Sequence, residues 1–275
     1  MDCVTFDRTR AVRRAAHAAL LASIAAAAGV LAGPARASLT DEIQVYLDDI
    51  DDPGRFGLEV HVNGTPSGVG EPSYPGEVTN DHGVRVTPEF SYGLAPGLEA
   101  GAYLPVVHAP SDTLSLAGAK LRLKWLPVRQ AGGGDGIFAG VNGELSDVAQ
   151  RFVQSRRGFE LRPILGARGG PWVAAVNPVL DIALGEPGRS QPPTFAPSFK
   201  VSRDLVPGVA TGFEYYAVLG PLSDVPAWPA QQHALYWAWD IDRKPWVVNL
   251  GLGRGLTAAT DRWTVKMIFE VPLEP

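Results

Sequence analysis

Short stretches of alternating apolar and polar residues constrain the fold of this chain more than any other feature. About twelve of them follow one another between residues 57 and 271, and residues that favour turns separate them. Since successive side chains on a β-strand point to opposite faces, each stretch predicts a strand with one apolar and one polar face. The expected strands are 57–63, 84–92, 98–106, 115–125, 136–145, 158–168, 172–184, 194–202, 209–219, 231–239, 246–254 and 263–271.

The alternation leaves two all-β architectures open. In a soluble sandwich the apolar faces of two sheets meet in a core. In an antiparallel up-and-down transmembrane barrel the apolar faces meet lipid, and the polar faces line a lumen. Nothing between residues 38 and 275 approaches eighteen apolar residues in a row, so we expect no membrane helix there.

The lengths of the connections favour the barrel. Those at 95–97, 169–171, 204–207 and 241–245 are short, whereas those at 64–82, 146–157, 185–193 and 221–230 are longer and rich in Pro, Ser, Gly and Asp. Bacterial outer-membrane barrels have short periplasmic turns and long external loops. The connection at 127–135, with three consecutive glycines, is the exception.

Aromatic residues at the strand ends point the same way. Barrels carry girdles of aromatic side chains at the membrane interfaces, and the chain offers Tyr92, Trp125, Trp172, Trp239, Trp246 and Trp263. A core of a soluble fold is the alternative use for them. An even strand count brings both termini of the barrel chain to the same, periplasmic side. Five prolines fit the pattern poorly because each removes a donor from the ladder: Pro88, Pro105, Pro163, Pro178 and Pro197.

The first 37 residues have the layout of a secretory signal peptide, with a basic start, an Ala/Leu-rich run and the small-x-small site at 35–37. A transmembrane helix is the competing interpretation, but the run is short and rich in alanine. We therefore expect export, with residues 38–56 as an acidic periplasmic segment, a short helix or a strand under the barrel mouth, and residues 57–275 as the barrel.

Charge and cysteine content exclude several classes of function. The leader holds five basic and two acidic residues, which leaves 19 basic against 27 acidic residues, a net charge of about −8. Such a balance argues against nucleic acid as a partner. The one cysteine, Cys3, lies in the leader, so a processed chain would have no disulfide and no thiolate site.

The charged faces of the strands give the candidate lumen. If the apolar faces meet lipid, the residues that line the interior are Glu59, His61, Arg85, Glu89, Glu99, Lys120, Arg122, Lys124, Glu144, Glu160, Arg162, Arg168, Asp181, Lys200, Glu214, Lys266 and Glu270. They either form a salt-bridged plug, which compensates the cost of burying charge, or line a narrow aqueous path. The basic row at 120, 122 and 124 could attract anions, but pairing with Glu99 and Glu144 on the adjacent strands is the safer interpretation.

Motifs for chemistry are sparse. None of the histidines at 61, 82, 108 and 233 forms a metal-spaced pair such as H-x-x-x-H, and no G-x-S-x-G elbow is present. Outer-membrane phospholipases use a His–Ser pair on the barrel wall, and neither His61 nor His233 has an obvious nucleophile at its height. The Gly-rich stretch at 251–255 lacks the strand–turn–helix context of a nucleotide loop. We expect no enzyme, no catalytic residue, no cofactor and no metal.

Four stretches carry a resemblance to a known family: 41–46, from Tyr92 to Pro105, 160–166 and 251–257. They resemble a proteobacterial family of uncharacterised outer-membrane proteins and, more loosely, porin-like proteins labelled as putative phenol meta-pathway components. The resemblance implies the barrel and the outer membrane, and it implies no substrate.

The strand at 263–271 is similar to the C-terminal signal read by the outer-membrane assembly machinery, although the chain ends in Leu273-Glu274-Pro275 instead of an aromatic residue. Expected partners are that machinery, outer-membrane lipid, lipopolysaccharide and a small solute. A passive channel or uptake barrel leads, and a plugged structural or binding barrel is the alternative.

Overall fold

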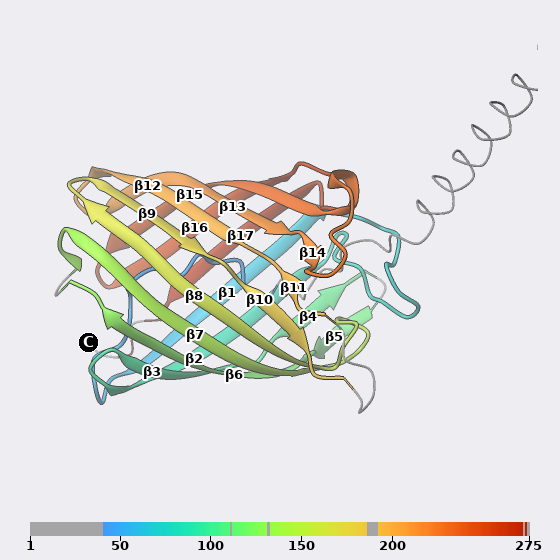
Figure 1. The fold of residues 1–275 in the computed structure, drawn as a ribbon, viewed down its shortest axis with the longest axis horizontal. Helices are drawn as coiled ribbons and strands as arrows, with labels where there is room; N and C mark the ends of the chain where they lie inside the picture. The colour runs from blue at the N-terminus through green and yellow to red at the C-terminus, as the bar shows by residue number, and fades with distance from the viewer. Residues whose placement is uncertain (1–40, 111, 131–132, 186–191, 272, 274–275) are drawn as a thin grey trace, which may run out of the picture. The chain divides into compact units, whose positions relative to one another are not determined.

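The computed structural model describes residues 41–110, 112–130, 133–185, 192–271 and 273. The expected leader, residues 1–37, lies outside them. From residue 56 onward the described chain is a single ring of antiparallel strands (Figure 1). No helix in this part of the chain is long and apolar enough to cross a membrane.

The strands are those that the alternation predicts, and most run further than expected. They are β1 (Phe56–Ser67), β2 (Val84–Ala95), β3 (Leu98–Tyr103), β4 (Val106–Ala109), β5 (Asp112–Leu116), β6 (Gly118–Val128), β7 (Gly136–Val148), β8 (Arg157–Gly169), β9 (Trp172–Asn177), β10 (Leu180–Ala183), β11 (Thr194–Phe195), β12 (Ser198–Val206), β13 (Val209–Val218), β14 (Gly220–Pro221), β15 (Gln232–Arg243), β16 (Trp246–Gly255) and β17 (Trp263–Glu270). A short 3-10 helix, η2 (Trp228–Ala230), lies between β14 and β15.

The ring has twelve members because five of them are interrupted. The pairs β3–β4, β5–β6, β9–β10, β11–β12 and β13–β14 each follow one path along the wall, broken by one or two residues. Every strand pairs with its neighbours in antiparallel register, and β1 pairs with both β2 and β17, which closes the ring. The predicted fold class, a closed antiparallel barrel of about twelve strands, is confirmed.

The five prolines sit at or beside these interruptions. Pro105, Pro178 and Pro197 lie in the breaks themselves. Pro88 and Pro163 stay within strands, but each lies next to a break in the adjacent member, because the pairing of β2 passes from β3 to β4 and that of β8 from β9 to β10 at their levels. The missing donors therefore coincide with gaps in the ladder, which is how a closed barrel accommodates them.

The two ends of the barrel differ. We call the end that carries the connections at 96–97, 129–135, 170–171, 207–208 and 244–245 the turn end, and the opposite end the loop end (Figure 1). Three of the short turns place a glycine at positive φ, 73° at Gly97, 54° at Gly170 and 74° at Gly208, a conformation that costs glycine little. The long connections, such as 68–83 and 256–262, gather at the loop end.

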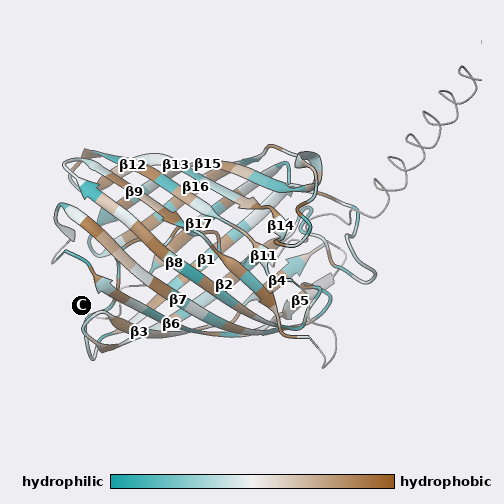
Figure 2. Cartoon of the chain, viewed as in Figure 1, coloured by the Kyte–Doolittle hydropathy of each residue, from teal (hydrophilic) through white to brown (hydrophobic). Residues whose placement is uncertain are grey.

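Burial along the wall is the reverse of that in a soluble protein. On β6, Leu121 and Leu123 expose 63% and 50% of their surface on the outer face, whereas Arg122 and Lys124 expose 8% each on the inner face. β17 repeats the pattern, with Val265 exposed and Lys266 buried. Figure 2 shows hydrophobic and hydrophilic residues alternating along the strands of the wall. The exposure values place the apolar side chains on the outside of the ring and the charged side chains on the inside.

Residues 41–53, called here the luminal segment, lie inside the ring. Hydrogen bonds join them to Asn63 on β1, Arg162 on β8, Asn177 on β9 and Lys266 on β17, strands from opposite sides of the wall. The expectation of a periplasmic helix or strand beneath the mouth is thus wrong for this segment. It failed because the acidic residues that look solvated in the sequence have buried cationic partners on the wall.

Gly93 allows the luminal segment to leave the lumen at the turn end. Pro53 forms an isolated parallel bridge with Gly93, and the Gly54 N–H donates to the Gly93 carbonyl at 2.8 Å. A Cβ atom at Gly93 would lie 2.1 Å from the carbonyl oxygen of Asp52. A side chain at this position is therefore incompatible with the observed path of the chain.

Candidate functional site

The candidate site is the lumen, built from the inward faces of the strands. Of the seventeen residues predicted to line it, eleven are at most 8% exposed and point inward: His61, Arg85, Glu89, Glu99, Arg122, Lys124, Glu144, Arg162, Lys200, Glu214 and Lys266. The side chains of Glu59 and Arg168 are 37% and 25% exposed, and Asp181 is half-buried. The side chains of Lys120 and Glu160 are 12% and 17% exposed. The Glu270 side chain, at the turn end, is 47% exposed.

The basic row on β6 is paired with carboxylates. Lys120 Nζ lies 3.3 Å from Glu144 on β7 and 2.8 Å from Asp41 of the luminal segment. Arg122 bridges two carboxylates, with Nη2 2.5 Å from Glu89 Oε1 and 2.6 Å from Glu99 Oε1. Lys120 and Arg122 are therefore neutralised from both neighbouring strands and from the lumen. Lys124 forms no ion pair with a described residue, and its Nζ lies 4.8 Å from the centroid of the Tyr46 ring.

A second cluster links the far side of the wall to the luminal segment. Glu214 on β13 accepts from Lys266 on β17, and Lys200 on β12 lies 3.2 Å from Glu214. Lys200 also donates to Asp240 at 2.8 Å. Lys266 Nζ donates to the backbone carbonyl of Ile43 at 3.0 Å. Each buried ammonium group thus has two acceptors, as a charge removed from water requires.

The luminal segment complements the remaining cations. Asp48 accepts two hydrogen bonds from Arg168, at 2.6 and 2.9 Å. Glu42 lies 3.4 Å from Arg162, whose guanidinium also lies 4.4 Å from the centroid of the Tyr46 ring. The sequence offered no signal for these contacts, because the partners are about 120 residues apart and only the barrel brings them together.

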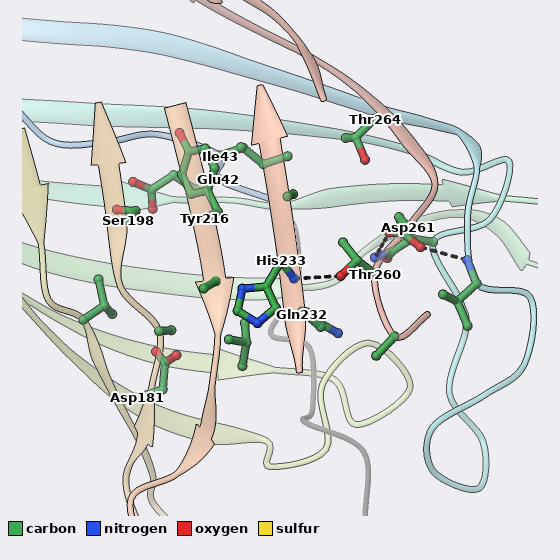
Figure 3. A pocket seen from close by; sticks show the side chains of 18 of the residues that line it. Glu42, Ile43, Asp181, Ser198, Tyr216, Gln232, His233, Thr260, Asp261 and Thr264 are labelled. Carbon is green, nitrogen blue, oxygen red and sulfur yellow. Dashed lines mark hydrogen bonds between the residues drawn. The ribbon is translucent and has the colours of Figure 1, made fainter. Parts of the chain in front are cut away.

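A cavity of about 380 Å³ lies between the luminal segment and the loop end. Figure 3 shows its lining: Glu42 and Ile43 from the segment, Asp181 and Ser198 from adjacent members of the wall, Tyr216 from β13, and His233 from β15. The loops close it with Thr260 and Asp261, and the His233 backbone N–H donates to Thr260 Oγ1 at 2.8 Å. A volume of this size suits a small solute.

The cavity is acidic. Six carboxylates line it, from Glu42, Glu71, Glu77, Glu160, Asp181 and Asp261, whereas Arg162 is its one guanidinium. Arg162 is already engaged, since its Nε donates to Glu160 at 2.7 Å. Asp181 has no hydrogen bond or ion pair with any described residue, and nothing in the sequence distinguishes it from the other luminal charges. It faces the cavity directly opposite Glu160 in the strand register.

The predicted aromatic residues lie on the outer face. Tyr92, Trp125, Trp172 and Trp246 flank the connections of the turn end and are 46–55% exposed. Trp239 packs against Trp237 with ring centroids 5.5 Å apart. Trp263, 39% exposed, begins β17 at the loop end. Five of the six predicted aromatic residues thus lie toward the turn end, and Trp263 lies at the loop end.

Comparisons with known proteins bear on the fold. No protein-family model matches this chain, and no curated protein matches its sequence. Among solved structures, an outer membrane channel from Pseudomonas putida superposes with a TM-score of 0.55 at 12% identity, over 83% of this chain and 99% of that chain.

Two further solved structures are similar at lower TM-scores. LpxR from Salmonella typhimurium has a TM-score of 0.41 at 9% identity, over 78% of this chain and 99% of that chain. The channel DcaP of Acinetobacter baumannii has a TM-score of 0.35 at 9% identity, over 78% and 95%. From the closed ring and its likeness to the Pseudomonas channel, the chain has the fold of a bacterial outer-membrane β-barrel.

Proposed function

We propose that this protein is a narrow outer-membrane channel or uptake barrel for small solutes, and that the cavity at the loop end receives the solute. The observation that carries the proposal is the carboxylate of Asp181, which pairs with no described residue, in a cavity of about 380 Å³ within the lumen. A barrel that served only as a scaffold would gain stability from pairing or removing such a charge.

We infer the direction of uptake from the two ends of the barrel. In outer-membrane barrels the short turns are periplasmic and the long loops external, so the cavity lies on the external side of the luminal segment. A solute would meet the cavity first and the salt-bridged section around Arg122 and Lys266 afterwards. That section makes the passage narrow and argues against a wide general porin.

The chemistry of the cavity favours a small solute with a positive charge. Carboxylates outnumber the guanidinium of Arg162, and Asp181 is free to accept a hydrogen bond from an ammonium group. Tyr216, Tyr236 and Val179 supply apolar and aromatic surface beside it, which suits cations through ring faces as well as through charge. We therefore infer selectivity for cations or protonated amines over anions.

Conductance of the purified, refolded barrel in a planar bilayer tests the proposal. We expect small steady steps and a reversal potential that favours cations. Asp181→Asn should reduce this preference. The control is Asp147→Asn, since Asp147 is an exposed residue at the loop end of β7 that pairs with Arg156; this substitution should leave the preference unchanged. Anion preference, or a preference that Asp181→Asn leaves intact, would contradict the assignment.

A cross-link decides how the luminal segment takes part. Cysteines at Asp41 and Lys120, whose side chains form an ion pair at 2.8 Å, can be bridged by a short bifunctional thiol reagent. If conductance persists in the bridged protein, solutes pass beside the segment. If it stops and returns after cleavage of the bridge, the segment must move. Silence in every state, including a variant whose segment is released, would favour a plugged scaffold.

We also propose that residues 1–37 are a cleaved signal peptide, and that lipid is the partner of the outer face. Leu121, Leu123 and Trp125 line a largely apolar groove of about 770 Å³ on that face. Unboiled protein should migrate differently from boiled protein on a detergent gel. Recovery in the soluble periplasmic fraction would overturn the location.

A further inference from the structure

We propose that Glu59, His61 and Glu89 form a binding site for one divalent transition-metal ion, of which Zn²⁺ is the best fit. The three side chains lie on the inner faces of β1 and β2, and Glu89 is the cross-strand partner of both Glu59 and Tyr103. This departs from the expectation of no metal, which rested on the absence of a helical H-x-x-x-H pair. On a strand the equivalent signal is the i, i+2 spacing of Glu59 and His61, which places both on one face.

The geometry needs little adjustment to hold an ion. His61 Nε2 lies 2.9 Å from Glu89 Oε2 and 3.8 Å from Glu59 Oε2, and the three ligand atoms all lie within 4.8 Å of one another. Tetrahedral zinc with bonds of about 2.1 Å separates its ligands by roughly 3.4 Å. The two observed distances bracket that value, so the side chains would move by less than an ångström or so.

An independent observation comes from the strand register. Glu270 on β17, Glu59 on β1 and Glu89 on β2 are direct cross-strand partners and form a row of three carboxylates. Like charges directly opposite one another destabilise a sheet. Glu89 is compensated by Arg122, and Glu270 has Lys244 at 3.9 Å. Glu59, between them, has no described cationic partner besides His61, so a bound cation would relieve the repulsion where it is greatest.

The surroundings leave the ligand atoms available. Glu89 uses Oε1 for Arg122, which donates from Nε at 2.7 Å, and this keeps Oε2 for the metal while fixing the orientation of the carboxylate. His61 is fully buried, and its Nδ1 has no hydrogen-bond partner among the described residues. With a proton on Nε2 the buried Nδ1 is an unsatisfied acceptor, and with a proton on Nδ1 the Nε2 lone pair faces two carboxylates. A cation at Nε2 removes the second conflict.

The ligand set selects the class of ion. Zinc accepts imidazole nitrogen and carboxylate oxygen as ligands, and three protein ligands leave its fourth position open for water. Calcium and magnesium prefer oxygen ligands alone and more of them. The Glu59 side chain is 37% exposed, which leaves the site accessible from the turn end. Bound there, the ion would tie β1 to β2 next to the point where the luminal segment leaves the lumen.

Metal binding by the purified full-length barrel, tag-free and stripped with a chelator, tests this inference. With ZnCl₂ in calorimetry and elemental analysis we expect one Zn²⁺ per chain, a higher urea midpoint, and no comparable effect of CaCl₂ or MgCl₂. Co²⁺ should give the intense visible absorption of a four-coordinate site. His61→Ala and Glu59→Gln should each weaken Zn²⁺ binding by at least tenfold, because each removes a ligand.

Glu59→Gln is the variant least prone to misfold, since Glu59 is the most exposed of the three ligands, and retained heat-modifiability would verify its fold. His108→Gln, at an exposed position on β4 near the loop end, is the control and should bind Zn²⁺ as the unmodified protein does. Absence of zinc binding in the unmodified barrel would overturn the inference and indicate an imidazolium held by the two carboxylates. So would binding that survives both Glu59→Gln and His61→Ala.

Discussion

The side-chain amide of Asn177 forms hydrogen bonds with both backbone groups of Tyr46. Asn177 Oδ1 accepts from the Tyr46 N–H at 2.7 Å, and Nδ2 donates to the Tyr46 carbonyl at 3.1 Å. Asn177 is fully buried and ends β9 at the break before Pro178. The Asn177 side chain thus satisfies the backbone N–H and carbonyl of Tyr46, as a neighbouring strand would do in a sheet.

Asn177→Ala should loosen the luminal segment. It leaves a buried N–H and a buried carbonyl without partners, at a cost of about 1–3 kcal/mol for each group, unless the segment moves to reach water. We expect faster proteolysis within residues 41–53 and larger or noisier conductance. The control is Asn142→Ala, because Asn142 is equally buried but its amide has no hydrogen-bond partner. Equal effects of the two substitutions would mean that the hydrogen bonds between Asn177 and Tyr46 do not hold the luminal segment in place.

The facing of the wall gives a second prediction. Leu123→Arg places a charge on the outer face, where the leucine is 50% exposed, and should destabilise the folded barrel in lipid by about 2–4 kcal/mol. Thr264→Arg places the same side chain beside the acidic cavity and should cost much less. Urea unfolding midpoints in liposomes measure both. Similar costs would show that the outer face does not meet lipid.

Most of the wall could be predicted from the sequence because a β-strand reports its own facing. The alternation along β6 and β17 indicates which side chains lie on the outer face, and this needs no knowledge of the neighbouring strands. The turns at Gly97 and Gly170 are equally local. The prolines were the sequence feature that disagreed with continuous strands, and Pro105, Pro178 and Pro197 do lie where strands of the wall are interrupted.

The luminal segment could not be predicted in this way. Its acidic residues read as a solvated stretch, and nothing local to Asp41 or Asp48 reveals that Lys120 and Arg168 are their partners. Such pairs depend on the register of strands that close the ring. The same holds for Asp181. That it pairs with no described residue depends on which side chains the closed ring places around it. The i, i+2 spacing of Glu59 and His61, in contrast, is local, and it predicts from the sequence that both side chains share one face of a strand.

Acid should loosen the long loop at 68–83. Asp81 Oδ1 accepts from the Gly68 N–H at 2.6 Å, and this hydrogen bond, followed by the neighbouring His82, lowers the pKa of Asp81. A lowered folded pKa means that the interaction contributes fully above the ordinary carboxyl pKa of about 4 and is lost as the pH falls through the lower folded value. Protease cleavage within 68–83, by an acid-active protease, should therefore increase toward low pH. Asp81→Ala, which removes the acceptor, should be cleaved readily at every pH, and a pH profile like that of the unmodified protein would contradict the role of Asp81.

The last prediction concerns Arg122, which holds Glu89 and Glu99 together in the lumen. Arg122→Glu removes the cation shared by two buried carboxylates and adds a third, so the folded state should lose about 3–5 kcal/mol, the usual cost of breaking a buried pair from one side. Urea unfolding measures this loss, and the reversal potential should shift toward cations if ions pass this level of the lumen. Lys124→Glu is the matched control: Lys124 lies two residues along the same face, but it contacts the Tyr46 ring at 4.8 Å and forms no described ion pair. Its substitution should cost much less. If the two substitutions were equally costly, charge pairing would not be what stabilises β6 against β2 and β3, and a change in neither stability nor selectivity would mean that Arg122 does not face the lumen at all.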